Sequence, residues 1–277
     1  MDYYLEHASG FEANTIRNRT QTFDHFCREA RVGKLPHPDL TVDHFEAWVK
    51  MHPEWSLSTR RSHINAVMAA FNHCVKRKKI KENPIHGVEK PRWERRKSII
   101  STSDQQAIHE ASKGAFRAIL TALKETGARP SELCRAMVSN YQEGMIVLSE
   151  HKEDDHIEVR TVHLPPALRS EVERLIGDRK VGPIWLNSRG QAWTPDTLYC
   201  RFKRLREKLG LKNAIFPYAY RGKFASDAIN ESDANPAMVA RLLGHADMTM
   251  LMKHYFRENP EAAQKALAEI RKKPRGS

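Results

Sequence analysis

The chain has 277 residues, long enough for about two domains, and its 40% hydrophobic and 29% charged residues give an ordinary globular composition. Its 46 Lys and Arg outnumber 34 Asp and Glu, and the resulting formal charge of +12 favours a polyanionic partner such as nucleic acid. Neither an apolar run of membrane-spanning length nor a secretory signal is present, so we expect a cytoplasmic protein that does not bind membranes.

The first part of the chain is predicted to be all-helical. Residues 14–31 carry apolar side chains at near-helical spacing, and Thr41 is placed to cap a short helix that ends near Lys50. Residues 57–79 are predicted to form a long helix that is buried along one side. The apolar residues of that side are Ile64, Val67, Met68, Phe71 and Val75.

A basic stretch follows, at residues 76–97, with ten Lys and Arg against three Glu and with prolines that interrupt regular structure. It fits a solvated hinge and a linker that follows a phosphate backbone equally well. We expect an N-terminal helical DNA-binding domain at 1–90, a basic linker at 91–102 and a second domain at 103–277. The candidate DNA contacts are Arg60, Arg61, His63, Asn65 and Asn72 on the long helix, then Lys76, Arg77, Lys78, Lys79, Arg92, Arg95 and Arg96.

The second part mixes helices with a β-hairpin. A capping box is predicted at Ser103, and a helix from Phe116 to about Thr126 is expected to stop at Gly127. The runs "MIVLS" and "IEVRTVHL", joined by the polar turn "EHKEDDH", predict two antiparallel strands. Further helices are predicted at "PPALRSEVERLIG", at "TPDTLYCRFKRLREKLG", from about Tyr218, at "NPAMVARLLG" and at about 260–273.

Cationic and hydroxyl side chains in the second part suit chemistry on a phosphodiester. Without a metal, such chemistry needs donors for the phosphate oxygens, an acid for the leaving oxygen and a nucleophile. Arginine binds two phosphate oxygens with one planar group. In chain order the candidates are Arg129, Lys152, Arg221, His245 and Tyr255. Each alone also fits an ordinary ion pair, surface cation, cap or core residue.

The order and spacing of four motifs resemble the tyrosine recombinase, or phage integrase, family. "TGARPSEL" is similar to the family's first-arginine motif, with Glu132 at its acidic position. "HKEDDHIEVRTVHLP" is similar to its lysine-bearing hairpin, "YAYR" to its second-arginine box and "RLLGHADMTMLMKHYFR" to its closing segment. The resemblance implies a mainly helical fold with a small antiparallel sheet. It implies a SAM-like helical core-binding domain followed by a mixed α+β catalytic domain.

The resemblance also implies a role for each residue. Tyr255 would be the nucleophile that forms a 3′-phosphotyrosine, and Arg129 and Arg221 would bind the phosphate. Lys152 would protonate the leaving oxygen, and His245 would hydrogen-bond the phosphate. Two supporting residues complete the set, which are Glu132 and Tyr218.

Two departures from the family pattern affect these roles. Tyr218 stands where the family usually has histidine, and a phenol is a poor base at neutral pH. The interval from His245 to Tyr255 is ten residues, where nine is common and would land on His254. Tyrosine rather than histidine is expected to be the nucleophile.

The implied partner is double-stranded DNA carrying a specific recombination site. The resemblance further implies a tetramer on DNA, accessory DNA-bending proteins and no metal or cofactor. The helix at about 260–273 would dock on a neighbouring protomer or fold onto its own domain. Two alternatives stay open. One is a DNA-binding relative with impaired chemistry, and the other is a single-duplex enzyme resembling type IB topoisomerases or telomere-resolving proteins.

Overall fold

The computed structural model describes residues 1–7, 10–92, 100–151, 157–211, 215–232 and 234–244, without the side chains of 150, 151, 157 and 158. The chain divides into two compact units, Met1–Arg96 and Lys97–Ser277. Several predicted residues and the predicted final helix lie outside the described residues. The residues are Arg95, Arg96, Lys152, His245 and Tyr255.

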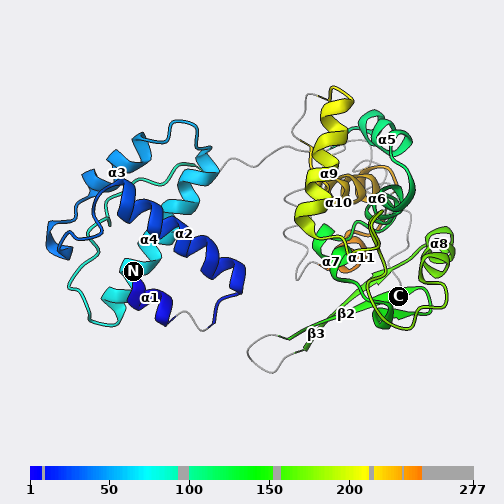
Figure 1. Cartoon of the computed structure of the whole chain (residues 1–277), viewed down its shortest axis with the longest axis horizontal. Coiled ribbons are helices and arrows are strands. Elements are labelled where there is room, and N and C mark those ends of the chain that lie inside the picture. The colour runs from blue at the N-terminus through cyan, green and yellow to red at the C-terminus, as the bar shows by residue number, and fades with distance from the viewer. Residues whose placement is uncertain (8–9, 93–99, 152–156, 212–214, 233, 245–277) are drawn as a thin grey trace, which may run out of the picture. The chain divides into compact units, whose positions relative to one another are not determined.

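The N-terminal unit is all-helical, as predicted (Figure 1). Its helices are α1 (Asp2–Glu6), α2 (Ala13–Glu29), α3 (Val42–Lys50) and α4 (Leu57–Lys76), with a 3-10 turn at His37–Asp39. Aromatic and aliphatic side chains from all four helices form its core, including Tyr4, Phe26, Trp48 and Val67. α1 was not predicted from the sequence.

α4 is shorter than the sequence suggested. It ends at Lys76 rather than near residue 79, and Lys78 has a φ of 55°. The side chains of Lys76 to Lys79 are all exposed, so nothing in the core requires the helix to continue. The long-helix prediction was therefore correct in its start and wrong in its end.

The second unit combines helices with a three-stranded antiparallel sheet in the order β1-β2-β3, which confirms the predicted fold class. The sheet comprises β1 (Tyr141–Gln142), β2 (Met145–His151) and β3 (Ile157–His163), of which β1 was not predicted. The helices are α5 (Thr102–Ala111), α6 (Gly114–Thr126), α7 (Pro130–Arg135), α8 (Pro166–Ile176), α9 (Pro195–Lys208), α10 (Ala219–Asn230) and α11 (Pro236–Leu243). A 3-10 turn lies at Val138–Asn140.

Local capping fixes several of these boundaries. The predicted cap at Ser103 is wrong, because the Ser101 hydroxyl accepts the Asp104 N–H at 3.0 Å and starts α5 earlier. The Thr194 hydroxyl accepts the Thr197 N–H and caps α9, as predicted. Gly127 ends α6 in the left-handed conformation, also as predicted. The residues after Gly127 can therefore turn away into α7.

α6 is the central helix of the second unit. It is buried along most of its length and packs beside α10 (Figure 1). One large cluster joins α6 to the sheet, α8 and α9, and a smaller one joins α10 to α11. This arrangement places the end of α6, the interior of α10 and the end of α11 in one region.

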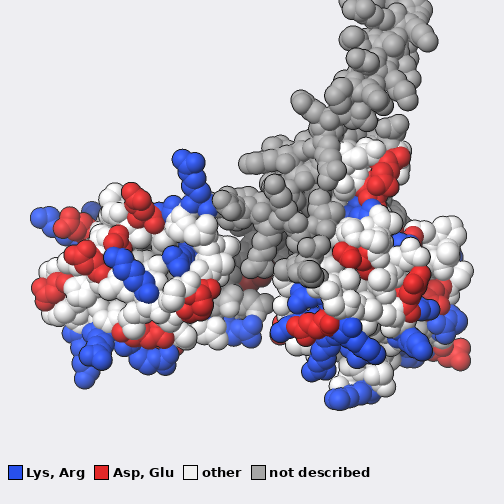
Figure 2. All heavy atoms as spheres, turned by 90° about the horizontal axis from the view of Figure 1, so that it is seen from above, with Lys and Arg blue, Asp and Glu red and all other residues white. Residues whose placement is uncertain are grey.

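The surface charge is mixed. Figure 2 shows Lys and Arg side chains interspersed with Asp and Glu on the face of each unit that it presents. Among the described residues, no helix is long and apolar enough to cross a membrane.

Candidate active site and nucleic-acid interface

Arg129 is placed by the junction between α6 and α7. It is the residue before Pro130 and occupies the cap position of α7. Its backbone N–H donates to Glu132 Oε2 at 2.8 Å, and its Nη1 donates to Glu132 Oε1 at 2.6 Å. The side chain of Arg129 is 37% exposed, whereas that of Glu132 is 2% exposed. A buried carboxylate therefore holds a guanidinium that still reaches solvent.

Arg221 lies in α10 and is completely buried. Its Nη1 donates to the Gly127 carbonyl oxygen at 3.1 Å, and its Nη2 donates to the Leu243 carbonyl oxygen at 2.6 Å. Burial lowers the pKa of Arg221, and the nearby Arg129 charge lowers it further, against the raising effects of Tyr218 and Glu132. Arginine keeps its charge even when buried, so α10 presents a fixed cation here.

The two arginines meet at the C-terminal end of α11. Arg221 binds the Leu243 carbonyl, and Arg129 Nη2 binds the next carbonyl, that of Gly244, at 3.4 Å. Carbonyls at a helix C-terminus carry partial negative charge and attract cations. Gly244 then leaves the helix in the left-handed conformation, with a φ of 65°. Two guanidinium groups from separate elements are thus held directly before position 245.

A third arginine was missed by the sequence reasoning. Arg160, on β3, is 8% exposed, and its Nε donates to the same Glu132 Oε1 that binds Arg129, at 3.2 Å. Its Nη1 donates to the Thr161 carbonyl. Its Nη2 is buried and has no hydrogen-bond partner among the described residues.

A sequence signal for Arg160 existed. Residues 160, 162 and 164 alternate toward one face in "EVRTVHL", and Val162 and Leu164 are buried. A charged residue on the apolar face of a strand needs a buried partner.

Glu132 is the acidic centre of this cluster. Burial by itself would raise the pKa of its carboxyl, but the positive charges of Arg160 and Arg129 and the Arg129 N–H bond outweigh burial and lower the pKa. The carboxylate is therefore ionised at neutral pH and is shared by two guanidinium groups. Three arginines with one carboxylate leave an excess of positive charge, which suits an anionic ligand.

Tyr218 occupies the N-cap position of α10, where its side chain makes no capping hydrogen bond, and it is 53% exposed. It lies close enough to Arg221 to influence the pKa of that guanidinium. Lys152, His245 and Tyr255 lie outside the described residues. The described part of the candidate site therefore consists of Arg129, Glu132, Arg221 and Tyr218 from the prediction and Arg160 in addition.

Three of the predicted DNA contacts on α4 already bind other residues of the N-terminal unit. Arg60 donates to the Trp55 and Pro53 carbonyls, and Arg61 donates to the Pro91 carbonyl. The Asn72 side chain accepts from Asn83. These three side chains therefore already bind other parts of the unit. The remaining described basic residues, which are Lys76, Arg77, Lys78, Lys79 and Arg92, are exposed.

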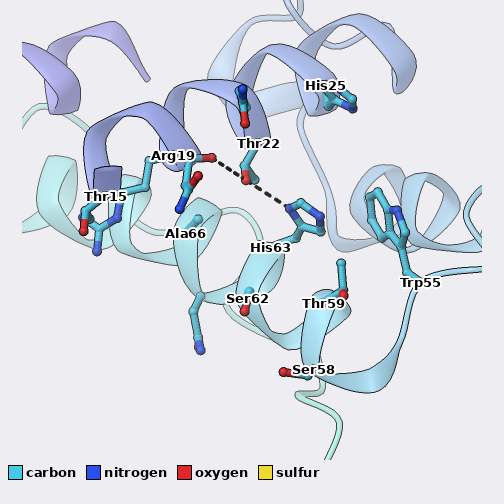
Figure 3. A pocket seen from close by; sticks show the side chains of 13 residues that line it. Thr15, Arg19, Thr22, His25, Trp55, Ser58, Thr59, Ser62, His63 and Ala66 are labelled. Atoms are coloured by element: carbon cyan, nitrogen blue, oxygen red, sulfur yellow. Dashed lines mark hydrogen bonds between the residues drawn. The ribbon is translucent and has the colours of Figure 1, made fainter. Parts of the chain in front are cut away.

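His63 and Asn65 instead line a polar groove of about 670 Å³ between α2 and α4. Figure 3 shows His63 between Thr22, whose hydroxyl lies 3.0 Å from its Nδ1, and Trp55. Burial lowers the pKa of His63, with a smaller lowering from the nearby His25 and His52. A neutral imidazole is favoured in this position. The groove also contains Arg19, which was not predicted as a contact.

Known proteins resemble this chain along most of its length. Residues 94–262 match the model described as "Phage integrase family", which is more than half of the chain, and the chain belongs to this family. Tyrosine recombinase XerC of Bacillus pumilus is 23% identical over 300 residues, covering 95% of this chain and 96% of the relative. A tyrosine recombinase of Pseudothermotoga lettingae is 26% identical over 228 residues, with 76% of each chain covered.

Solved structures share the fold. The Tn1549 transposon integrase in complex with a circular intermediate DNA superposes with a TM-score of 0.75 at 18% identity, covering 96% of both chains. A lambda integrase tetramer bound to a Holliday junction gives a TM-score of 0.72 at 18% identity, covering 90% of this chain and 76% of that chain. Family membership assigns the chain to the tyrosine recombinases as a class of enzyme.

Proposed function

We propose that this protein is a site-specific DNA recombinase that cuts and rejoins strands through a 3′-phosphotyrosine. The single observation that supports this most is the meeting of Arg129 and Arg221 at the consecutive carbonyls of Leu243, the last residue of α11, and Gly244, which follows it. Two guanidinium groups from elements far apart in sequence share one location, beside the buried carboxylate of Glu132. A phosphodiester carries two nonbridging oxygens, which two such groups can bind together.

In the proposed reaction, the Tyr255 oxygen attacks the scissile phosphorus and a tyrosine–phosphate bond forms. The bond to the 5′ oxygen breaks, and Lys152 supplies the proton that this oxygen takes up. The phenolic proton passes to His245 or to water. Because one phosphoester replaces another of similar energy, the strand can be resealed without ATP. Arg129 and Arg221 stabilise the charge that develops on the phosphate.

The proposal is tested with a nicked DNA substrate from which the cut fragment diffuses away, so that a covalent protein–DNA adduct accumulates. We expect the adduct with the natural protein, with or without EDTA, and none with Tyr255→Phe. His254→Gln serves as the matched control, because it changes the neighbouring candidate and leaves the phenol in place. An adduct that survives Tyr255→Phe would show that the nucleophile is another residue.

Product topology separates this function from its alternatives. A recombinase yields exchanged strands between two sites, whereas a single-duplex relative relaxes supercoils or forms hairpin ends. A DNA-binding relative without chemistry shifts labelled DNA in a gel and forms no adduct.

The proposed partners are duplex DNA with a specific site and three further copies of the chain. Support comes from the solved neighbours, among them a lambda integrase tetramer on a Holliday junction. Mass measurement of the complex on a synthetic four-way junction tests this assembly. A monomer or dimer on the junction at saturating protein would contradict it.

A further inference from the structure

Arg160, the buried arginine of β3, has no role in the proposed reaction. We propose that Arg160 is a positioning residue that holds the Glu132 carboxylate in the orientation that fixes the Arg129 guanidinium for phosphate binding. The tests of this proposal by DNA cleavage rest on the proposed function, whereas its test by protein stability does not.

Arg129 and Arg160 share one oxygen of Glu132. Glu132 Oε1 accepts from Arg129 Nη1 at 2.6 Å and from Arg160 Nε at 3.2 Å, while Oε2 accepts the Arg129 backbone N–H. Arg129 lies only three residues before Glu132, so it contacts the carboxylate from within the same turn of the chain. Arg160 approaches from a different element, so it restrains the carboxylate in a direction that Arg129 cannot.

Arg160 also packs against Gly244, the residue that ends α11. A Cβ atom at Gly244 would lie 2.7 Å from Arg160 Cδ and 2.8 Å from Nε, which is closer than real Cβ contacts allow. The stem of Arg160 therefore fills the space beside the glycine whose carbonyl accepts from Arg129. One side chain thus contacts both the carboxylate and the glycine that bind Arg129.

Arg160 also supplies positive charge to a buried carboxylate. Glu132 is almost completely buried, and a buried carboxylate requires nearby positive charge. The charged groups near it are Arg129 at the start of α7, Arg160 on β3 and Arg221 on α10. The hydrogen bonds of Arg221 go to backbone carbonyls. Arg160 is therefore the second hydrogen-bonding cation of Glu132 among the described residues.

The main test is a double-mutant cycle on the single-turnover rate of adduct formation, using Arg160→Met, Glu132→Gln and the double variant. We expect Arg160→Met to lower this rate about 10- to 100-fold, as misplacement of a catalytic group by about 1 Å can do. We expect the affinity for DNA to change less than about threefold. The double variant should be no slower than the slower single variant, because both changes disturb the same group.

Arg174→Met is the matched control. Arg174 is an exposed arginine on α8 that binds Glu171, so the same atoms are removed from a surface ion pair. Its rate should equal that of the natural protein. If the rate reductions of Arg160→Met and Glu132→Gln multiplied in the double variant, the two residues would have independent roles and the proposal would be overturned. An unchanged rate in Arg160→Met would also overturn it.

A second substrate excludes action through the hairpin lysine. Replacing the scissile 5′ oxygen by sulfur gives a leaving group that needs no protonation. If Arg160→Met lowers the rate through Arg129, the rate should stay low on this substrate, because phosphate binding is still needed. If the sulfur substrate restored the rate of Arg160→Met, the defect would act through Lys152 and the proposal would fail. Arg160→Lys keeps the charge and should recover part of the rate.

The stability test requires no DNA and holds even if the protein forms no adduct. The lowered pKa of Glu132 stabilises the fold above the ordinary glutamate value, about 4.3, and this stabilisation is lost as pH falls through the lowered value. The melting temperature of the natural protein should therefore rise relative to Glu132→Gln as pH increases toward about 5, and the difference should stay level above that pH. In the Arg160→Met background this rise should shrink or reverse. An equal rise in both backgrounds would contradict the coupling.

Discussion

Gly127 is the residue on which the geometry of the arginine cluster depends most directly. Its φ of 61° ends α6, and its carbonyl accepts from the buried Arg221. A Cβ atom there would lie 2.6 Å from Phe224 Cδ1 and 2.8 Å from Leu243 Cδ2. The position therefore excludes side chains for two separate reasons, which are backbone conformation and space.

We expect Gly127→Ala to lower the free energy of unfolding by about 2–4 kcal/mol, from left-handed strain together with overpacking. Denaturant unfolding followed by circular dichroism measures this. Gly210→Ala is the control, because Gly210 has a φ of 64° with nothing within 4 Å of the added atom. That variant should lose only about 1 kcal/mol. Equal losses would show that the contacts with Phe224 and Leu243 yield easily.

At this scale the sequence predicted part of the cluster. Arg129, Glu132 and Arg221 were identified through motifs, and the structure brings them together. Arg160 was missed because its partner lies on another element, and local patterns contain no information about which carboxylate a strand residue meets. The close approach of Gly244 to Arg160 is likewise a tertiary contact.

In the N-terminal unit, Glu29 at the end of α2 binds α3 and the residues after it. Its Oε2 accepts from Trp48 Nε1 at 2.7 Å and lies 2.9 Å from His52 Nε2. His52 also lies 3.0 Å from Glu54 and stacks on Trp55 with ring centroids 4.0 Å apart. This cluster joins two helices through charge as well as through packing.

The pKa values within the cluster shift in opposite directions. The Trp48 N–H lowers the pKa of Glu29, which outweighs the raising effect of burial, with further lowering from His52 and His25. Burial opposes the charge on His52, but its bonds to Glu29 and Glu54 outweigh burial and raise its pKa. The glutamate contribution to stability exists above about pH 4.3, and the histidine contribution exists below about pH 6.5.

We therefore expect His52→Gln to destabilise the N-terminal unit most between about pH 4.5 and 6.5, by about 1 kcal/mol. The difference from the natural protein should decline as pH rises through the raised pKa of His52. Melting temperature across pH 4.5 to 8.5 measures it. His86→Gln, a change at an exposed histidine of the same unit, should show no such profile. A pH-independent difference would mean that His52 contributes only by packing on Trp55.

Element boundaries were predictable wherever one local interaction sets them. Thr194 and Gly127 mark helix ends through their own side chain or backbone conformation. Ser101 and Ser103 offered two equivalent hydroxyls, and the sequence could not distinguish them. α1 and β1 are short, and packing against the core or pairing with β2 maintains them, so they left no periodic pattern.

The molecule as a whole has a formal net charge of +12. On the described surface, its basic side chains are interspersed with acidic ones (Figure 2). At the end of α4, residues 76–79 are four consecutive basic residues, and all four are exposed. If these residues bind phosphates, each lysine contributes to the release of counterions when DNA binds.

We expect the DNA affinity to fall steeply with salt, and Lys78→Ala with Lys79→Ala to reduce the slope of log affinity against log salt by about 2. Binding isotherms between 50 and 200 mM salt measure the slope. A double change of Arg169 and Arg174 on α8 to Ala is the control, because it removes the same net charge where both arginines bind glutamates. Equal slopes in the two double variants would indicate a general field effect.

The two units bury separate hydrophobic cores. Selection can therefore alter the helices of the first unit without changing the arginine cluster of the second. Under the proposed function, descendants of one ancestral gene can diverge in the DNA sites that they recognise while they keep the same arginine cluster. Exchanging residues 1–92 between relatives is the laboratory equivalent of that history.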